Sequence, residues 1–125
     1  MTVSTSGTIT RYHVGKRLSE TAVHNGTIYL AGQIPENNPG ADIRTQTEEV
    51  LGHVERLLKE AGGSKELILS CQIFVADPAD FAVMNEVWDA WVVPGHTPPR
   101  CTVIAAALNP DYRIEVVVVG AQIKA

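Results

Sequence analysis

The chain has 125 residues, of which 45% are hydrophobic and 19% are charged, and its formal net charge is -4 at pH 7. This length suits one globular unit, so we expect a single domain over residues 1–125 whose core needs no disulfide or metal. The acidic balance gives no electrostatic reason to expect a nucleic-acid partner, because phosphate binding usually needs a basic face.

The N-terminal part of the chain predicts three strands. Weak alternation of apolar and polar residues over 8–14 predicts an edge strand. The segments 18–24 and 27–32 are joined by Asn25-Gly26, a dipeptide that readily adopts the two positive φ angles of a type I′ turn. We therefore expect a hairpin over 18–32.

After a loop over 33–41, apolar residues recur every three or four positions, which predicts an amphipathic helix. Its start is open between two caps, because Asp42 competes with a capping box that begins at Thr45. Gly62-Gly63 supplies the left-handed stop. The residues expected on its buried face are Ile43, Thr47, Val50, Leu51, Val54, Leu57, Leu58 and Ala61.

The segment 67–75 predicts a strand with one apolar side and one mixed side. Its expected apolar side consists of Leu69, Cys71, Ile73 and Val75. Asp77-Pro78 predicts the start of a second helix that ends before Pro94, since a side-chain acceptor precedes a ring already set to helical φ. The expected buried stripe of this helix consists of Phe81, Met84, Val87, Trp88 and Trp91.

Two further strands are expected over 100–104 and 114–119, with turn-forming residues at 109–111 between them. The order β-β-β-α-β-α-β-β predicts an α+β fold in which two helices cover one face of a mixed sheet. Valines occur at both parities of 114–119, which predicts burial on both sides of that strand. Because two helices cover only one face, we expect another subunit on the other, and hence a homo-oligomer.

Each of these last strands carries one charge in apolar surroundings, Arg100 at the start of the first and Glu115 inside the second. Arg100 alone is more typical of a surface arginine at a strand end. Two interpretations of Glu115 stay open: a structural ion pair with Arg or Lys, or a carboxylate that acts in a desolvated pocket. Together they suit a small-carboxylate site, because Arg binds carboxylates bidentately while Glu orients water or accepts a proton.

Other kinds of site lack a signature. The four histidines have no partner at metal-ligand spacing, and the sequence contains no Gly-rich phosphate loop and no nucleophile elbow. We therefore expect no metal and no cofactor. Cys71 and Cys101 fall in expected strands and are interpreted as reduced core thiols, with Cys101 pointing away from Arg100.

The first seven residues lack the basic and apolar regions of a signal peptide. The longest apolar run is far shorter than the ~20 residues that cross a bilayer. Since the two thiols form no disulfide framework, we expect a cytoplasmic protein without a membrane partner.

Several separate segments carry recognisable motifs. They are LAGQIP at 30–35, AD at 76–77, DFA at 80–82, MNE at 84–86, PRCTV at 99–103 and IEV at 114–116. Together they resemble the YjgF-like Rid family of reactive-intermediate deaminases, also labelled RutC-like or endoribonuclease L-PSP, over about 18–122. The segment WDAWVVPGH at 88–96 is similar to the YoaB-like branch of that family.

The resemblance implies a chorismate-mutase-like fold, assembled as a homotrimer whose sheets form a central barrel with three clefts between subunits. It also implies cofactor-free hydrolysis of reactive enamines and imines, such as 2-aminoacrylate, to a 2-keto acid and ammonia. That activity is the one of 2-iminobutanoate/2-iminopropanoate deaminases. The expected partner is therefore a small carboxylate-bearing imine or keto acid.

In the mechanism implied by the resemblance, Arg100 binds the substrate carboxylate, and Glu115 places the attacking water or transfers protons. Backbone groups near Ala31, Gly32 and Thr102 contact the substrate and the developing charge. The resemblance also implies that Asn85 braces the cleft from the second helix.

Three positions depart from the deaminase branch, which tends to carry tyrosine, serine and cysteine where this chain has Leu18, Ala31 and Thr102. Loss of the tyrosine hydroxyl removes one polar contact, for which Arg17 and Ser19 beside Leu18 are possible replacements. Two alternative functions remain: a non-catalytic trimer that binds small carboxylates, and a ribonuclease. The acidic charge and the lack of a histidine beside Arg100 oppose the ribonuclease.

Overall fold

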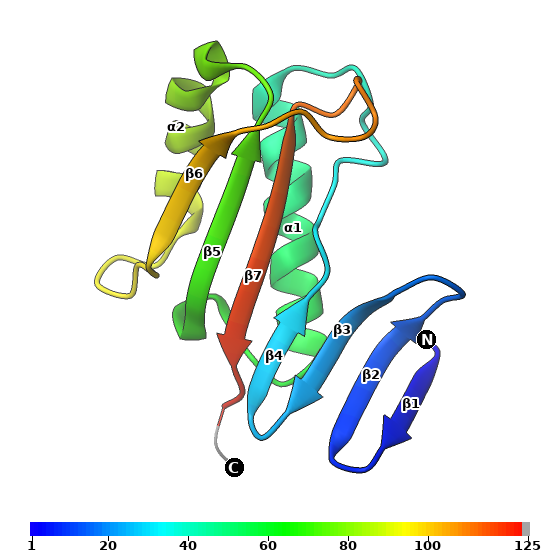
Figure 1. The fold of residues 1–125 in the computed structure, drawn as a ribbon. Coiled ribbons are helices and arrows are strands. Elements are labelled where there is room, and N and C mark those ends of the chain that lie inside the picture. The colour runs from blue at the N-terminus through cyan, green and yellow to red at the C-terminus, as the bar shows by residue number, and fades with distance from the viewer. Residues whose placement is uncertain (124–125) are drawn as a thin grey trace.

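The computed structural model describes residues 1–123 as a seven-stranded mixed sheet with two helices on one face (Figure 1). The strands are β1 Val3–Ser6, β2 Ile9–Val14, β3 Ser19–His24, β4 Thr27–Leu30, β5 Ile68–Val75, β6 Arg100–Ile104 and β7 Ile114–Ala121. The helices are α1 Ile43–Glu60 and α2 Phe81–Trp91, and single 3-10 turns occur at η1 Lys65–Leu67 and η2 Pro78–Asp80. Neither helix is long and apolar enough to cross a membrane.

The strand order is β1-β2-β3-β4-β7-β5-β6, so the last strand of the chain lies inside the sheet. β7 is antiparallel to both β4 and β5, whereas β5 and β6 are parallel. The predicted α+β arrangement, with both helices on one face, is confirmed. We call the face packed against α1 and α2 the helix-covered face, and the other the open face.

The N-terminal strands differ from the sequence expectation in one respect. β1 was not predicted, and because it pairs with β2 on the side away from β3, β2 is not the edge of the sheet. The hairpin between β3 and β4 is confirmed, since Asn25 and Gly26 have φ angles of 50° and 79° as a type I′ turn requires.

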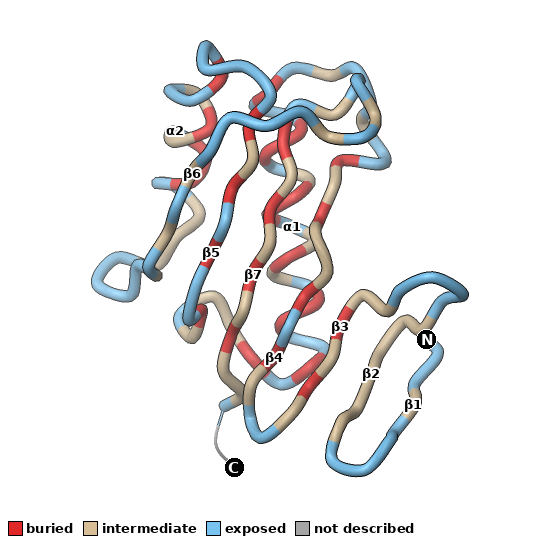
Figure 2. The backbone as a smooth tube through the Cα atoms, viewed as in Figure 1, coloured by how far each residue is buried: buried red, intermediate tan, exposed pale blue. Residues whose placement is uncertain are grey.

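The first helix begins at the earlier of its two candidate caps. The Thr45 N–H donates to Asp42 Oδ1 at 2.9 Å, so Asp42 is the N-cap, and Gly62 with φ 86° follows the helix end. The apolar face of α1 is buried as predicted (Figure 2). Its buried residues include Ile43, Thr47, Val50, Leu51, Val54, Leu57 and Leu58.

Two residues expected on the buried sides of β5 and α2 are exposed. Leu69 is 50% exposed because the register of β5 shifts between Ile68 and Ser70, and this bulge turns Leu69 out of the alternation. Phe81 is 42% exposed because η2 precedes α2 and sets where its buried stripe begins, at Met84. The other residues expected on these two sides are buried, except for Trp91, which is partly buried against the core.

The open face carries apolar side chains that no helix covers. On β7, Ile114, Val116 and Val118 are buried under the helices, while Val117 and Val119 on the open face are only partly buried. The neighbouring open-face residues Tyr29 and Val103 are 49% and 43% exposed. The double-sided apolar character read from the sequence therefore lies on a surface of the single chain.

Two glycines of α1 and its C-terminal turn allow a matched test of packing. A Cβ at Gly63 would lie 2.7 Å from Ile28 Cδ1 and 3.1 Å from the Ala121 carbonyl oxygen, whereas a Cβ at Gly52 meets nothing within 4 Å. We expect Gly63→Ala to lower the free energy of unfolding by about 1 to 3 kcal/mol. Gly52→Ala should raise it by about 0.5 to 1 kcal/mol, because glycine is entropically unfavourable inside a helix. Urea unfolding at equal subunit concentration measures both, and equal effects would contradict the packing.

Candidate functional site

The sheet contains a bulge where β4 approaches the start of β7. Tyr29 pairs with Val119, and Gln33 makes an isolated bridge with Val116, so four residue steps on one side face three on the other. The Gln33 N–H donates to the Val116 carbonyl at 2.8 Å, and the Val116 N–H donates back at 3.1 Å. The extra residue frees the backbone near Gly32 from regular pairing.

Glu115 occupies the space that this bulge leaves. A Cβ on Gly32 would lie 2.1 Å from Glu115 Oε2, so only glycine at this position leaves room for the carboxylate. Among the described residues, neither the ion pairs nor the hydrogen bonds involve the Glu115 carboxylate. Over residues 1–123 of one chain the structural ion pair considered for Glu115 is therefore absent, and we interpret its carboxylate as available to a ligand.

Gln33 holds the bulge in place. Its side chain, with only 4% of the residue exposed, donates from Nε2 to the Ala31 carbonyl at 2.9 Å and to Glu20 Oε2 at 3.0 Å. The Ala31 N–H donates to the Glu20 carbonyl at 2.9 Å. Sequence reasoning gave Gln33 and Glu20 no role, although an amide next to the glycine of a strand end is a group that needs partners once buried.

A pocket of about 370 Å³ opens beside Glu115 on the open face. It is lined by Phe74, Ala105, Ala106, Ala107, Leu108, Arg113, Ile114 and Glu115. Arg113 is the nearest cation in this lining, but its Nη1 donates to both oxygens of Asp80 at 3.1 Å. The Arg113 guanidinium therefore neutralises the buried Asp80, and Glu115 has no counter-ion in the part of the chain that the structure describes.

Arg100 and Thr102 lie together on β6, at the opposite edge of the sheet from β1. The Arg100 guanidinium lies 5.1 Å from the ring centroid of Trp88, within cation–π range. Both residues line a pocket of about 460 Å³ with Pro78 and Phe81. The exposed Phe81 therefore lines the same pocket as Arg100. The Thr102 hydroxyl oxygen is buried and has no hydrogen-bond partner among residues 1–123.

The structure does not bring Arg100 and Glu115 together within one chain. β5 separates their strands, with Arg100 opposite Cys71 and Glu115 opposite Phe74. Paired residues share a face of the sheet, and Cys71 is buried on the helix-covered face while Phe74 lies on the open face. The two charges therefore project from opposite faces, and a site that uses both must draw them from two copies of the chain.

The remaining predicted site residues are dispersed. Leu18, in the β2–β3 connection, is 56% exposed. Asn85 lies partly buried on α2, and its side chain has no hydrogen bond within the described part of the chain. No hydrogen bond within residues 1–123 therefore supports its predicted bracing role.

The interpretation of both cysteines as core thiols is right for Cys71 and wrong for Cys101. Cys101 does point away from Arg100, but that direction is the open face, so it is exposed in the single chain. Cys71 is buried, and burial raises the pKa of its thiol to about 12.

The expectation that no histidine has a partner at ligand spacing is wrong for His53. His53 follows Glu49 by one helical turn on α1, and the loop before the helix adds Glu36. One ligand-type atom from each of these three residues lies within 4.8 Å of the other two. Sequence spacing does not indicate this cluster, because Glu36 is far along the chain from Glu49 and His53.

Comparison with known proteins gives consistent results. The family model described as Endoribonuclease L-PSP matches residues 8–122. The RutC family protein YoaB of Escherichia coli K12 is 46% identical over 114 residues, 91% of this chain and 98% of that protein. A RutC family protein of Haemophilus influenzae is 42% identical over 113 residues, covering 90% and 97%. The crystal structure of a YjgF family member from Neisseria meningitidis superposes with a TM-score of 0.90 at 38% identity, covering 94% and 97%.

The buried position of Cys71 predicts slow thiol chemistry. Because its pKa is raised to about 12, the thiol stays protonated and unreactive at pH 8 as long as the core is closed. In a Cys101→Ser variant we expect no release of chromophore from a disulfide reagent until urea unfolds the protein. Rapid labelling of the native variant would contradict the burial of Cys71.

Proposed function

The chain belongs to the endoribonuclease L-PSP family, which includes the RutC and YjgF proteins, and we propose that it hydrolyses reactive enamines and imines. The substrates are of the 2-aminoacrylate type, and the products are a 2-keto acid and ammonia. The observation that carries the proposal is Glu115, a partly buried carboxylate seated against Gly32 and paired with no cation among residues 1–123. The protein has the chorismate-mutase-like fold of its structural relatives.

Arg100 supplies the first recognition element. Its guanidinium offers a planar fork of donors that matches a carboxylate bidentately. The lining by Pro78, Phe81 and Thr102 gives an apolar wall for a short side chain and one hydroxyl that has no partner among the described residues. A small 2-imino acid therefore binds through its carboxylate, with its C2 atom directed toward the neighbouring copy.

Glu115 supplies the acid–base step. An enamine first gains a proton at C3 and becomes an iminium. Glu115 then orients a water, accepts a proton from it as the oxygen bonds to C2, and returns that proton to the nitrogen. The C–N bond of the resulting carbinolamine breaks, ammonia leaves and the C2 carbonyl forms as the hydroxyl proton passes to solvent, which supplied the proton at C3. In this proposal the Gly32 N–H stabilises the developing oxygen charge, because the N–H groups of Ala31 and Gln33 already donate to the Glu20 and Val116 carbonyls.

The assembly completes the site. Because Arg100 and Glu115 face opposite sides of one sheet, the proposal takes Arg100 from one copy and Glu115 from the next. A closed trimer repeats this contact three times and covers the open-face residues Tyr29, Val117 and Val119, which are apolar and uncovered in the single chain.

A second function, carboxylate binding without turnover, is favoured by one observation. Leu18 is 56% exposed and apolar where the deaminase branch tends to carry a tyrosine, so one polar contact of the reaction is missing. Calorimetry separates the two functions: binding of 2-ketobutyrate on Arg100, with no ammonia release from imines, supports the sensor and opposes the hydrolase.

Removal of either charge tests the proposed roles. We expect Arg100→Ala to lower kcat/KM for imines generated from amino acids by about 100-fold or more, through loss of a bidentate charged contact. Glu115→Gln should lower kcat by about 100-fold to 10,000-fold, the usual range for an acid–base group. The matched controls Arg11→Ala, on β2 at the far side of the sheet, and Glu66→Gln, on η1, should retain activity. Unchanged rates in the site variants would refute the assignment.

A mixing experiment tests whether the site spans two copies. Arg100→Ala and Glu115→Gln subunits are each inactive, but in a mixed trimer some clefts combine an intact Arg100 with an intact Glu115. Random equimolar reassembly should restore about a quarter of wild-type activity, because each intact residue is present at half of the positions. Mass spectrometry of the intact assembly verifies the mixing. Mixed trimers with no restored activity would show that both residues act within one chain.

A further inference from the structure

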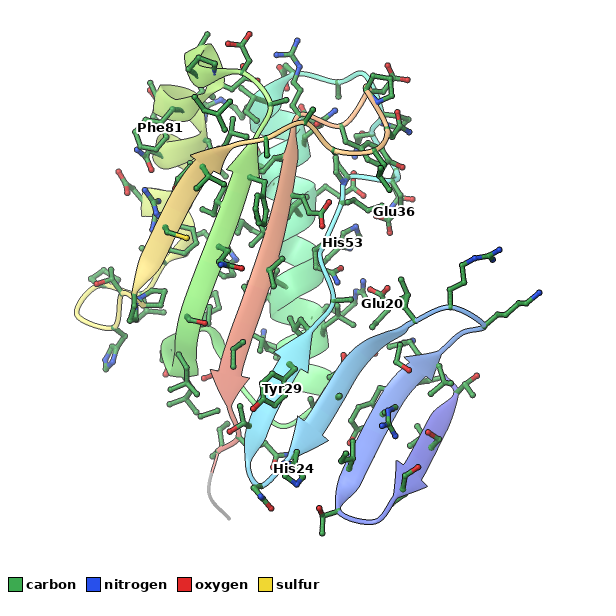
Figure 3. The ribbon with its side chains drawn as sticks, in the orientation of Figure 1. Glu20, His24, Tyr29, Glu36, His53 and Phe81 are labelled. Atoms are coloured by element: carbon green, nitrogen blue, oxygen red, sulfur yellow. The ribbon has the colours of Figure 1, made fainter. Side chains whose placement is uncertain are left out.

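Glu36, Glu49 and His53 form a compact cluster on elements that carry neither Arg100 nor Glu115. Glu49 and His53 lie one turn apart on α1. Glu36 lies on the loop between β4 and α1, and Figure 3 shows it near His53. The side chains of Glu49 and His53 are only 8% and 12% exposed, while that of Glu36 is 50% exposed. Glu49 and His53 thus form the buried part of the cluster, and Glu36 forms the part that reaches solvent.

Hydrogen bonding defines the protonation of the imidazole. Arg56 Nη2 lies 3.1 Å from His53 Nδ1, and because a guanidinium only donates, Nδ1 is the acceptor. The proton therefore resides on Nε2, which donates to Glu49 Oε2 at 2.8 Å. Glu36 Oε2 also faces Nε2, at 3.4 Å. That distance is longer than a good hydrogen bond, and one N–H proton does not satisfy two carboxylates.

The cluster places two carboxylates around a single imidazole nitrogen with too little positive charge between them. Glu49 is held rigidly, since it accepts from the Asn37 N–H at 3.0 Å and from Asn38 Nδ2 at 2.7 Å. Glu36 has no hydrogen bond to its carboxylate within residues 1–123. A divalent cation at the position of the Nε2 proton would join all three groups and neutralise both carboxylates.

The distances fit a first-row transition metal. Zn²⁺ takes nitrogen and oxygen ligands at about 2.0 to 2.1 Å, so neighbouring ligands of a tetrahedral ion lie about 3.3 Å apart. The two separations of His53 Nε2 from the carboxylate oxygens are 2.8 and 3.4 Å, and all three atoms fall within 4.8 Å. Ordered Asn37 and Asn38 contacts to Glu49 provide the outer support that metal ligands usually have.

We propose that Glu36, Glu49 and His53 form a binding site for a divalent transition-metal ion of the Zn²⁺ class. An imidazole ligand favours such ions over Mg²⁺ and Ca²⁺, which prefer oxygen alone. On binding, the metal takes Nε2 and the imidazole proton moves to Nδ1, so no net proton is released by His53. Nδ1 is then a donor, and the exposed Arg56 guanidinium swings away from it.

The site would also fix a loop that begins at the candidate functional site. Glu36 lies three residues after Gln33, the residue that braces the bulge beside Glu115. An ion held jointly by Glu36 and α1 joins this loop to the helix. The metal has no part in the proposed hydrolysis, so the two proposals stand or fall separately.

Calorimetric titration of the tag-free full chain with Zn²⁺, and the visible absorption of bound Co²⁺, test the site. We expect one ion per chain, with Mg²⁺ and Ca²⁺ giving no binding at the same concentrations. Glu49→Gln and His53→Gln should weaken Zn²⁺ binding by more than about 100-fold, since each removes a ligand. Glu48→Gln, an exposed neighbour on α1, is the matched control and should bind as the wild type does.

Arg56→Ala provides a test in the opposite direction. Removal of the competing cation should tighten Zn²⁺ binding by about two- to fivefold, the size expected for one exposed charge. Thermal unfolding of each metal-free variant checks that it is folded. Absence of Co²⁺ bands and of binding heat in the folded wild type would overturn the proposal, as would equal Zn²⁺ affinity in wild type and Glu49→Gln.

Discussion

The position of β7 between β4 and β5 is the constraint on which the rest of the structure depends. β7 joins the N-terminal antiparallel strands to the βαβ unit of β5, α2 and β6. Its residues Ile114, Val116 and Val118 are almost fully buried against the helices, so register is fixed by large apolar side chains. A shift of one residue would expose all three and bury Glu115.

That fixed register also positions the chemistry. The segment after β4 contains one more residue than the part of β7 that it faces, which makes a bulge. This bulge places Gly32 against the Glu115 carboxylate and buries Gln33 beside it. The same alternation puts the odd residues of β7 on the open face, away from Arg100. One strand therefore supplies the core on one face. On the other face it carries a carboxylate that has no ion pair among the described residues, within an apolar surface suited to a second copy.

Local signals in the sequence predicted local structure well. Asn25-Gly26 adopts its turn, Asp42 caps α1 and Gly62 ends it, because each depends on the chemistry of a few neighbouring residues. Hydrophobic periodicity predicted burial wrongly where an irregularity interrupts a strand or precedes a helix. The bulge in β5 exposes Leu69, and the 3-10 turn before α2 precedes an exposed Phe81. Neither the bulge nor the 3-10 turn is indicated by a particular residue type in the sequence.

The sequence by itself determined the α+β class, the two helices on one face and the family, and it identified Arg100 and Glu115 as the charges in apolar strands. Only the tertiary structure decided how these residues relate in space. β5 lies between β6 and β7, and its pairing register with each sets Arg100 and Glu115 on opposite faces. The open face exposes Cys101. The loop before α1 brings Glu36 to His53. Such relations depend on strand order and loop paths, which involve residues distant in the chain and leave no periodic trace along it.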